Sequence, residues 1–467
     1  MKSLSRALRT VILATTITFT SAAPSLAQGN NSSVPGSELN SSEVQDLARQ
    51  ILQLGTMERN GVMARLVDRG DTDVVPALIQ SLRFLGQDPW TIVDALKILT
   101  GEDHGTRWHD WVLWQEGRPD IIPFDGFDEY KSWIYSHIDP NLGAFLYAGM
   151  PHTIRLEEIT WGGVIKDGIP ALVNPTLIPP AEADYLTPDE LVFGVEINGD
   201  VRAYPLRIMD WHEMFNDVIG GVPVALAYCT LCGSGILFET SVPGRDASFE
   251  FGSSGFLYRS NKLMFDRETD TLWNQFTGKP VAGELVGSGI ELKVRPVAIT
   301  SWAKWRARHP ETKVLSLDTG FDRDYTPGKP YASYFNSPNL MFPARVNDTR
   351  LAAKDYVFAL RLGDAEKAWA LDLFNDTPVL NDTIGGRAVV LVGDPDSRTV
   401  RAYETGGNSF TAHGDATETL VSGGNAWHIT EAELVSGKGE TLARLPGHIA
   451  YWFAWQNFRP GSETRFE

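Results

Sequence analysis

Apolar residues between positions 41 and 118 recur with the 3.6-residue period of an amphipathic helix. The first series follows Ser41 or Ser42, either of which can cap a helix, and it consists of Val44, Leu47, Ala48, Ile51 and Leu52. Similar series predict a helix capped near Asp71, a third helix that begins at Pro89, and a fourth around Trp108. The spacing therefore predicts a module of short consecutive helices.

These paired short helices, with the segment LTGEDHGTRWHDW, resemble a degenerate HEAT-like helical repeat. The resemblance covers residues 41–118 and implies docking of a protein partner rather than chemistry. Residues 119–189 are rich in Pro, Gly and aromatic side chains, and we predict an irregular segment that wraps the next domain.

From Glu190 onward the apolar period changes to two, which is the period of a strand. The runs LVFGVEI and VRAYPL flank the turn Asn198-Gly199-Asp200, a strong hairpin signal. A short helix is expected from Ile208 to about Val218, followed by a buried strand, GVPVALAYC, and further strands. The predicted fold class is α+β, with the helical module followed by β-rich domains.

The C-terminal third repeats this layout. The hexapeptide that begins at Asn216, NDVIGG, has the counterpart NDTIGG beginning at Asn381, an offset of 381 − 216 = 165 residues. Further along, Trp305 is matched by Trp455, an offset of 455 − 305 = 150. The first copy thus has 165 − 150 = 15 extra residues, which we place around GSSGFLYRSNKLMFDRET. We predict two duplicated β-rich domains, residues 190–335 and 336–467.

The second copy lacks three chemically capable residues of the first. Thr377 stands at the position of His212, and LVGDPDS replaces the region of Cys229 and has no thiol. Because the scaffold can be built without His212, Cys229 and Cys232, these residues are candidates for a site. The alternative is drift, in which one copy simply lost a disulfide.

The N-terminus predicts a signal peptide over residues 1–27. Basic Lys2, Arg6 and Arg9 precede an apolar run that is too short to span a bilayer comfortably, and Ser25-Leu26-Ala27 matches a cleavage site. The alternative is an N-terminal anchor. Residues 28–40 are small and polar, as in a linker. We expect a periplasmic or secreted, soluble protein with no membrane span. Its formal charge of −18 makes nucleic acid an unfavourable partner.

Cys229 and Cys232 are the two cysteines of the chain and form a Cys-x-x-Cys motif. In an oxidising compartment such a pair is a labile disulfide, a redox pair or a pair of metal ligands. The loop between them is too short for a disulfide to add much stability. A thioredoxin-like site is disfavoured, because there the motif opens a helix whose dipole lowers the thiol pKa, whereas Gly233-Ser234-Gly235 leads into a predicted strand.

His212 precedes an acid, Glu213, and is either a metal ligand or a buried imidazole bonded to backbone. With Cys229 and Cys232 it would provide three ligands and leave one open position, and thiolates favour Cu(I) or Zn(II). Glu213 could act as general base or be a solvated acid. Asp266 and Arg267 are the other ionisable candidates for the same cleft, unless they form only a salt bridge.

Two long motifs carry a family resemblance. AYPLRIMDWHEMFNDVIGGVPVALAYCTLCGS and FGSSGFLYRSNKLMFDRETDTLWNQ closely resemble the bacterial family called domain of unknown function 3179, over about residues 160–335. The resemblance implies an exported bacterial protein and supplies no activity. One departure is Thr230, where a proline is common, and it leaves the redox poise of the loop undecided.

Three functions follow from these residues. The first is a copper or zinc site held by Cys229, Cys232 and His212. The second is a thiol–disulfide redox protein that uses the cysteine pair. The third is a non-catalytic binding or scaffold protein. No feature of the sequence identifies a small-molecule ligand.

Overall fold

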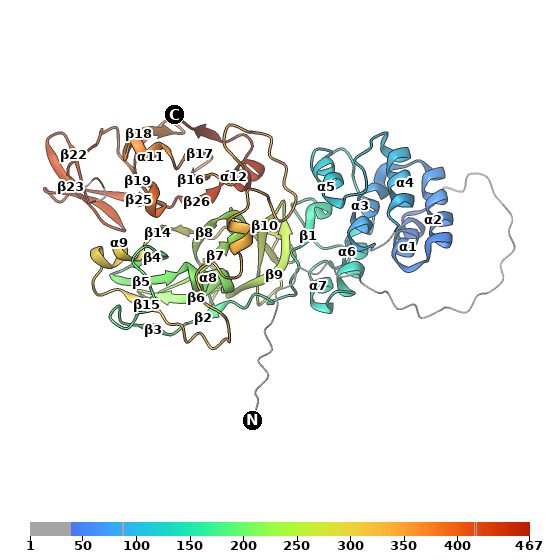
Figure 1. Cartoon of the computed structure of the whole chain (residues 1–467), viewed down its shortest axis with the longest axis horizontal. Coiled ribbons are helices and arrows are strands. Elements are labelled where there is room, and N and C mark those ends of the chain that lie inside the picture. The colour runs from blue at the N-terminus through green and yellow to red at the C-terminus, as the bar shows by residue number, and fades with distance from the viewer. Residues whose placement is uncertain (1–38, 86–87, 415, 417) are drawn as a thin grey trace, which may run out of the picture. The chain divides into compact units, whose positions relative to one another are not determined.

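The computed structural model describes residues 39–467 except 86–87, 415 and 417 (Figure 1). The predicted signal peptide and nearly all of the predicted linker therefore lie outside the described residues. The described residues form two compact units: one runs to Ile165 and includes Ala282–Val286, and the other consists of Lys166–Val281 and Gly287–Glu467. No helix among the described residues is both long and apolar enough to cross a membrane.

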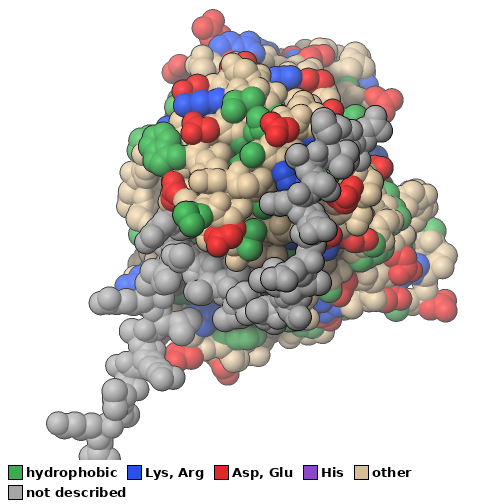
Figure 2. Space-filling view, turned by 90° about the vertical axis from the view of Figure 1, so that its right-hand side faces the viewer, with side chains coloured by type: hydrophobic (Ala, Val, Ile, Leu, Met, Phe, Trp, Pro, Cys, Tyr) green, Lys and Arg blue, Asp and Glu red, His purple; other side chains and the backbone are tan. Residues whose placement is uncertain are grey.

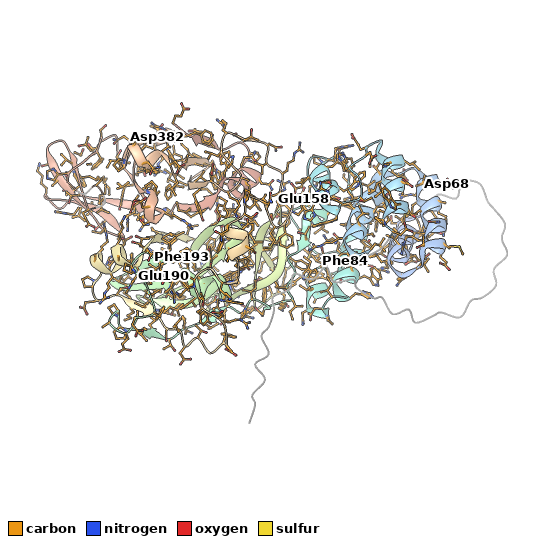
Figure 3. The ribbon with its side chains drawn as sticks, in the orientation of Figure 1. Asp68, Phe84, Glu158, Glu190, Phe193 and Asp382 are labelled. Atoms are coloured by element: carbon orange, nitrogen blue, oxygen red, sulfur yellow. The ribbon has the colours of Figure 1, made fainter. Side chains whose placement is uncertain are left out.

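The first unit is helical. Its elements are α1 (Ser41–Gln53), α2 (Thr56–Arg69), a 3₁₀ turn η1 (Thr72–Val74), α3 (Val75–Phe84), α4 (Trp90–Thr100), α5 (Trp108–Glu116), α6 (Phe127–Ser136), α7 (Pro140–Ala144), η2 (Leu156–Glu158) and β1 (Ile159–Trp161). In the core of this unit the ring of Phe84, labelled in Figure 3, packs edge-on against Tyr135 with centroids 6.3 Å apart. The helical region predicted from periodicity is present.

The helices of the first unit differ from the prediction in three places. Asn40 rather than Ser41 or Ser42 caps α1, and it completes a capping box with Glu43. The sequence pattern missed α2, whose buried face includes the charged Arg59; the Arg59 Nε donates to the Ile51 carbonyl at 2.9 Å. Helices α6 and α7 fall in the stretch predicted to be irregular, where aromatic residues form the buried face of α6.

The face of the molecule shown in Figure 2 carries acidic and basic side chains interspersed with separate, small apolar patches. Where grey atoms do not cover it, this face shows neither a single-sign field nor a broad apolar surface. The predicted docking of a protein partner by the helical module stays a prediction.

The second unit contains the same series of elements twice. The first repeat consists of β4 (Leu191–Ile197), β5 (Asp200–Pro205), α8 (Leu206–His212), β6 (Met214–Ile219), β7 (Val222–Cys229), η3 (Thr230–Cys232), β8 (Ser234–Glu239), β14 (Ala298–Ser301), α9 (Trp302–Arg308) and β15 (Lys313–Leu315). The second repeat consists of β16 (Tyr356–Leu362), β17 (Ala365–Ala370), α11 (Leu373–Asp376), β18 (Val379–Ile384), β19 (Arg387–Asp394), η4 (Pro395–Ser397), β20 (Thr399–Glu404), β26 (His448–Tyr451), α12 (Trp452–Phe458) and β27 (Glu463–Arg465).

The remaining elements connect or extend the repeats. They are β2 (Leu172–Val173), β3 (Leu177–Ile178), β9 (Phe251–Tyr258), β10 (Asn261–Asp266), β11 (Leu272–Asn274), β12 (Lys279–Ala282), β13 (Val294–Arg295), α10 (Ala332–Phe335), β21 (Thr411–Ala412), β22 (Thr419–Ser422), β23 (Asn425–Ile429), β24 (Glu433–Ser436) and β25 (Thr441–Leu445). The predicted helix from Ile208 to about Val218 ends at His212, because Met214–Ile219 pairs as a strand with Val222–Ala227. The fold class predicted from the sequence, α+β, is confirmed.

The two repeats build equivalent sheets. The strand order β14-β4-β5-β15 in the first repeat corresponds to β26-β16-β17-β27 in the second, and β13-β8-β7-β6 corresponds to β25-β20-β19-β18. The turn between β4 and β5 is the predicted one, and Asn198 and Gly199 there have φ of 51° and 80°.

Polar contacts inside the scaffold are duplicated too. Asn216 makes two hydrogen bonds with the backbone of Phe251, and Asn381 makes the same two with Phe410. Phe251 and Phe410 are 410 − 251 = 159 residues apart, which is 165 − 159 = 6 fewer than the offset between Asn216 and Asn381. Six of the fifteen extra residues of the first repeat therefore lie between β8 and β9. This is ahead of the segment in which we placed them. Asn216 and its counterpart are structural, since both repeats use them in the same way.

One hydrophobic core runs through both repeats. It includes Phe193, labelled in Figure 3, and Phe215 from the first repeat together with Phe358 and Trp369 from the second. The contact between the repeats is reciprocal, since β14 packs on β20 and β26 packs on β8. Since β14 is equivalent to β26 and β8 is equivalent to β20, both contacts join the same pair of elements from opposite repeats. This is the arrangement of an isologous two-fold interface.

Candidate functional site: a buried cysteine pair and the cavity beside it

The Cys-x-x-Cys motif forms a tight turn between two strands. Cys229 is the last residue of β7, Thr230–Cys232 form the 3₁₀ turn η3, and Gly233 at φ 59° leads into β8. Both cysteines are free, and their Sγ atoms lie 2.7 Å apart. The motif enters a strand and not a helix, as predicted, so no helix dipole acts on the thiols.

The second repeat has the same turn without sulfur. There Asp394 and Ser397 occupy the positions of Cys229 and Cys232, and the Ser397 hydroxyl donates to the Asp394 carboxylate. The turn therefore folds with an ordinary hydrogen bond in place of the sulfur pair. Because the turn forms without thiols in the second repeat, folding of the turn does not explain Cys229 and Cys232. The two cysteines therefore remain candidates for a site.

The two sulfurs are buried, with exposed fractions of 2% for Cys229 and 0% for Cys232. The Asn261 amide donates to the Cys232 Sγ at 3.2 Å, and the Cys232 thiol donates to the Ser260 carbonyl at 3.4 Å. Burial, together with the neighbouring Cys229, raises the pKa of the Cys232 thiol well above its ordinary value. Cys232 is therefore held as a neutral thiol.

Asn261 is itself fixed by a second amide. Its side chain donates to Gln275 Oε1 at 3.0 Å, and Gln275 Nε2 donates to the carbonyls of Ala227 and Ser234 at 2.8 and 2.9 Å. The two amides thus connect the Cys232 sulfur to the backbone on both sides of the turn. Asn261 and Gln275 come from β10 and the segment after β11, which lie in the region that makes the first repeat longer.

A buried ion pair lies next to the turn. Glu213 follows α8 in the left-handed conformation, at φ 54°, and this backbone geometry directs its side chain back toward η3. Its carboxylate accepts from Lys262 Nζ at 3.0 Å, Thr230 Oγ1 at 2.9 Å and Tyr331 Oη at 2.8 Å. Glu213 and Lys262 are 6% and 3% exposed. With Cys229, Cys232, Thr230, Tyr331, Asn261 and Gln275, they form what we call the cysteine cluster.

His212 takes part in a different set of contacts. Its Nδ1 lies 2.8 Å from the Pro170 carbonyl, which can only accept, so Nδ1 carries the proton. Its Nε2 then accepts from the Tyr325 hydroxyl at 2.7 Å. Burial lowers the pKa of His212 to about 4, and the ring is neutral at pH 7. No lone pair of this imidazole is left for a metal ion.

The predicted three-ligand metal site is not assembled in this structure. Among the described residues, no three His, Cys, Asp or Glu side chains are grouped so that they could hold a metal ion. The physical reason is that the helix ends at His212 and β6 begins directly after Glu213. In this position the imidazole of His212 bonds to Pro170 and Tyr325 instead of to the sulfurs. Of the predicted site residues, the structure brings together Cys229, Cys232 and Glu213.

Asp266 and Arg267, predicted as catalytic, are not part of the cysteine cluster. Asp266 lies five residues beyond Asn261 along β10, a separation of about 16 Å at the rise of a strand. Its carboxylate accepts from Thr269 and from the Trp273 indole, so it holds a turn. Arg267 pairs with Asp167 and Glu250 on the surface. Asp266 therefore stabilises the turn after β10, and Arg267 forms surface ion pairs beside it.

Lys262, Asn261, Gln275 and Tyr331 were missed by the sequence reasoning. They lie between 32 and 102 residues after Cys229, counted along the chain, within runs that indicate only strands or turns. For Asn261 and Lys262 the duplication was a weak signal, because the segment in which we placed the extra residues of the first repeat could have been searched for polar side chains.

Replacing His212 by alanine is expected to lower the free energy of unfolding by about 2–4 kcal/mol, because two buried hydrogen bonds and the packed ring are lost. The thiol content and the reactivity of the folded protein should stay unchanged. Chemical unfolding followed by fluorescence measures the first effect, and thiol titration measures the second. A stoichiometric copper or zinc ion in the wild-type protein that disappears from this variant would contradict a purely structural role for His212.

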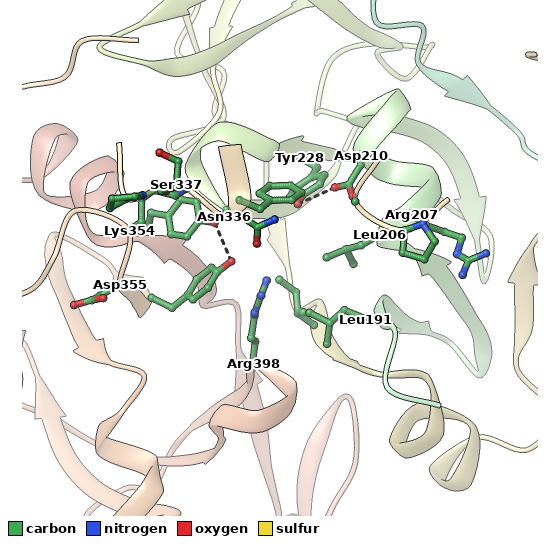
Figure 4. A pocket seen from close by; sticks show the side chains of 18 of the residues that line it. Leu191, Leu206, Arg207, Asp210, Tyr228, Asn336, Ser337, Lys354, Asp355 and Arg398 are labelled. Carbon is green, nitrogen blue, oxygen red and sulfur yellow. Dashed lines mark hydrogen bonds between the residues drawn. The ribbon is translucent and has the colours of Figure 1, made fainter. Parts of the chain in front are cut away.

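A cavity of about 600 Å³ lies beside the cysteine cluster, between the two repeats (Figure 4). Its wall includes Tyr228 and Gly233, the residues directly before and directly after the Cys229–Cys232 segment. The second repeat contributes Tyr356, Arg398 and Tyr451, and the connection between the repeats contributes Phe335 to Pro338. The size of the cavity suits a small organic molecule.

One family model matches the chain, over residues 166–462, and is described as Protein of unknown function (DUF3179). The chain belongs to this family. The match runs on past residue 335 and includes both repeats, so the family domain contains the cysteine cluster and the cavity together. No curated protein and no solved structure matches the chain.

Proposed function

We propose that Cys229 and Cys232 form a dithiol–disulfide redox couple. The observation that carries the proposal is the 2.7 Å separation of two free sulfurs in a turn that needs neither of them for folding. Oxidation removes two electrons and two protons from the pair and forms one S–S bond. The co-reactant is a small disulfide, which takes up the two electrons and the two protons and leaves as two thiols.

The two sulfurs have different roles in this proposal. Cys229, the slightly more exposed one, attacks the small disulfide and forms a mixed disulfide with release of the first thiol. Cys232 then attacks the Cys229 sulfur and releases the second thiol. The raised pKa of Cys232 supports this order, because a neutral thiol is a poor first nucleophile.

The neighbours of the pair act as positioning residues. Both carboxylate oxygens of Glu213 already accept hydrogen bonds from Thr230, Lys262 or Tyr331, so Glu213 orients the turn instead of serving as a free base. The Tyr334 hydroxyl donates to the Leu231 carbonyl at 2.6 Å and covers the turn from the connection between the repeats. This cover favours a small disulfide over a protein disulfide. A dithiol–disulfide couple also agrees with the export that we propose from residues 1–27, because disulfides form and persist in oxidising compartments.

The test is a redox titration of the folded protein in glutathione buffers, read by counting free thiols and by mass. We expect reversible loss and return of both thiols in the wild type. Cys232→Ser should accumulate a mixed disulfide with glutathione at Cys229, whereas Cys229→Ser should react far more slowly.

Three controls make the result decisive. Metal analysis comes first, because stoichiometric copper or zinc bound by the two cysteines would favour the metal-site function instead. The double variant Cys229→Ser with Cys232→Ser should fold and show no redox response. If both thiols of the folded wild type stay reduced over the whole range of accessible potentials, the proposal is wrong.

A further inference from the structure

Among the described residues, two cations in the cavity between the repeats make no ion pair with a carboxylate. The Arg398 guanidinium lies over the ring of Tyr356, 4.4 Å from its centroid, and points into the cavity (Figure 4). The Lys354 ammonium lies 3.8 Å from the centroid of the Tyr334 ring and donates to the carbonyls of Tyr334 and Ser337. Within the part of the chain that the structure describes, neither side chain makes an ion pair with a carboxylate.

Below neutral pH the other charges of the cavity leave these two cations uncompensated. Arg207 pairs with Glu190 in the same wall. Asp355 is exposed and accepts a hydrogen bond from the Ala352 backbone. Asp210 is 5% exposed and accepts from the Tyr228 hydroxyl at 3.3 Å. Burial and the nearby Glu213 raise its pKa to about 7, although the Tyr228 hydrogen bond and the positive charge of Arg398 act in the opposite direction, so below neutral pH this carboxyl is largely uncharged.

Arg398 also occupies an unusual backbone position. It ends the turn η4 at φ 55°, in the left-handed region, where the first repeat has Gly233 at φ 59° in the same place. Gly233 and Arg398 both line the cavity. A left-handed arginine is strained relative to glycine, and such strain persists where a side chain has a function.

We propose that this cavity binds a small organic carboxylate. Its carboxylate pairs with the planar fork of Arg398, which suits two-point recognition of a carboxylate. Its apolar part lies against Leu191, Leu206 and the ring of Tyr228. The proposal does not depend on the redox function of the cysteine pair.

Isothermal titration of the full chain with 2-naphthoate, and with the neutral 2-naphthamide of the same shape, tests the proposal. We expect naphthoate to bind about 10- to 100-fold more tightly than naphthamide, the range for a charge-assisted hydrogen-bonded contact. Because Asp210 gains its charge as the pH rises through about 7, the affinity for naphthoate should fall between pH 6 and pH 8.

Substitutions at Arg398 separate binding from folding. Arg398→Gly restores the residue that the first repeat uses, so naphthoate binding should fall by about tenfold or more while the melting temperature stays equal or rises. Arg398→Ala should lose the same binding without the rise in melting temperature. Arg306→Gln, on the exposed face of α9 and outside the cavity wall, should leave binding unchanged.

Three outcomes overturn the proposal. They are no measurable binding of naphthoate at millimolar concentration, equal affinity for naphthoate and naphthamide, and undiminished naphthoate binding by a folded Arg398→Gly variant. Loss of redox activity in the cysteine variants has no bearing on these measurements.

Discussion

Replacing Lys262 by methionine is expected to destabilise the folded protein by about 3–5 kcal/mol at pH 7. Lys262 and Glu213 form an ion pair in which both side chains are nearly inaccessible, with exposed fractions of 3% and 6%. Methionine fills a similar volume but leaves the Glu213 carboxylate buried without its counter-ion. The desolvation of that charge is then offset only by the hydroxyls of Thr230 and Tyr331.

A double-mutant cycle isolates this interaction. Glu213→Gln combined with Lys262→Met removes both charges, and we expect it to recover most of the lost stability. The matched control is Lys293→Met, the same substitution at a lysine that is 64% exposed and pairs with Glu239 on the surface. There the change should stay below about 1 kcal/mol. Urea unfolding curves measure all of these proteins, and a Lys262→Met variant as stable as the control would contradict a buried ion pair.

Replacing Asp210 by asparagine is expected to stabilise the protein, by about 4 kcal/mol above pH 7. Burial raises the folded-state pKa of Asp210 to about 7 from an ordinary value of 3.8. Between these two values the folded state holds a proton that the unfolded state has lost, so the stability of the wild type falls as the pH rises from about 4 to 7. Above pH 7 the full cost of a buried carboxylate is present, at about 1.36 kcal/mol for each pKa unit.

The asparagine side chain does not titrate, and its carbonyl can still accept from Tyr228. The difference in unfolding free energy between variant and wild type should therefore be near zero at pH 4, grow up to pH 7 and then level off. Asp355→Asn, at the exposed carboxylate of the same cavity, should change stability by less than about 0.5 kcal/mol at every pH. Urea unfolding from pH 4 to pH 9 gives these curves, and a difference that does not depend on pH would show that Asp210 titrates in the ordinary range.

The two predictions have opposite signs for one physical reason. Glu213 is buried with a cation and two hydroxyl donors, so its charge is compensated and losing a partner is costly. Asp210 is buried, and the Tyr228 phenol at 3.3 Å and the charge of Arg398 do not offset the desolvation of its carboxylate, so removing that charge is favourable. The buried Asp210 carboxylate lies on the wall of the cavity and lowers the stability of the fold. Such a loss of stability is consistent with a cavity that serves binding.

The sequence by itself determined the period of each region, the hairpin at Asn198-Gly199 and the duplication, because these depend on neighbours a few residues apart or on a direct comparison of two segments. It also singled out Cys229 and Cys232 by their absence from the second copy, and Glu213 as the acid beside His212. It did not predict α2, where Arg59 takes part in the buried face, or the early end of α8, where strand pairing overrides the continuing helical pattern.

Only the tertiary structure decided which side chains surround the sulfurs. His212 is closer to Cys229 in the sequence than Lys262, Asn261 or Tyr331, yet its two ring nitrogens bind Pro170 and Tyr325, while those three residues reach the cysteine cluster. The direction of a side chain depends on the pairing of strands and on a left-handed residue such as Glu213, which local patterns do not encode. The cavity with Arg398 exists only because two repeats pack face to face, and that contact is not contained in either repeat alone.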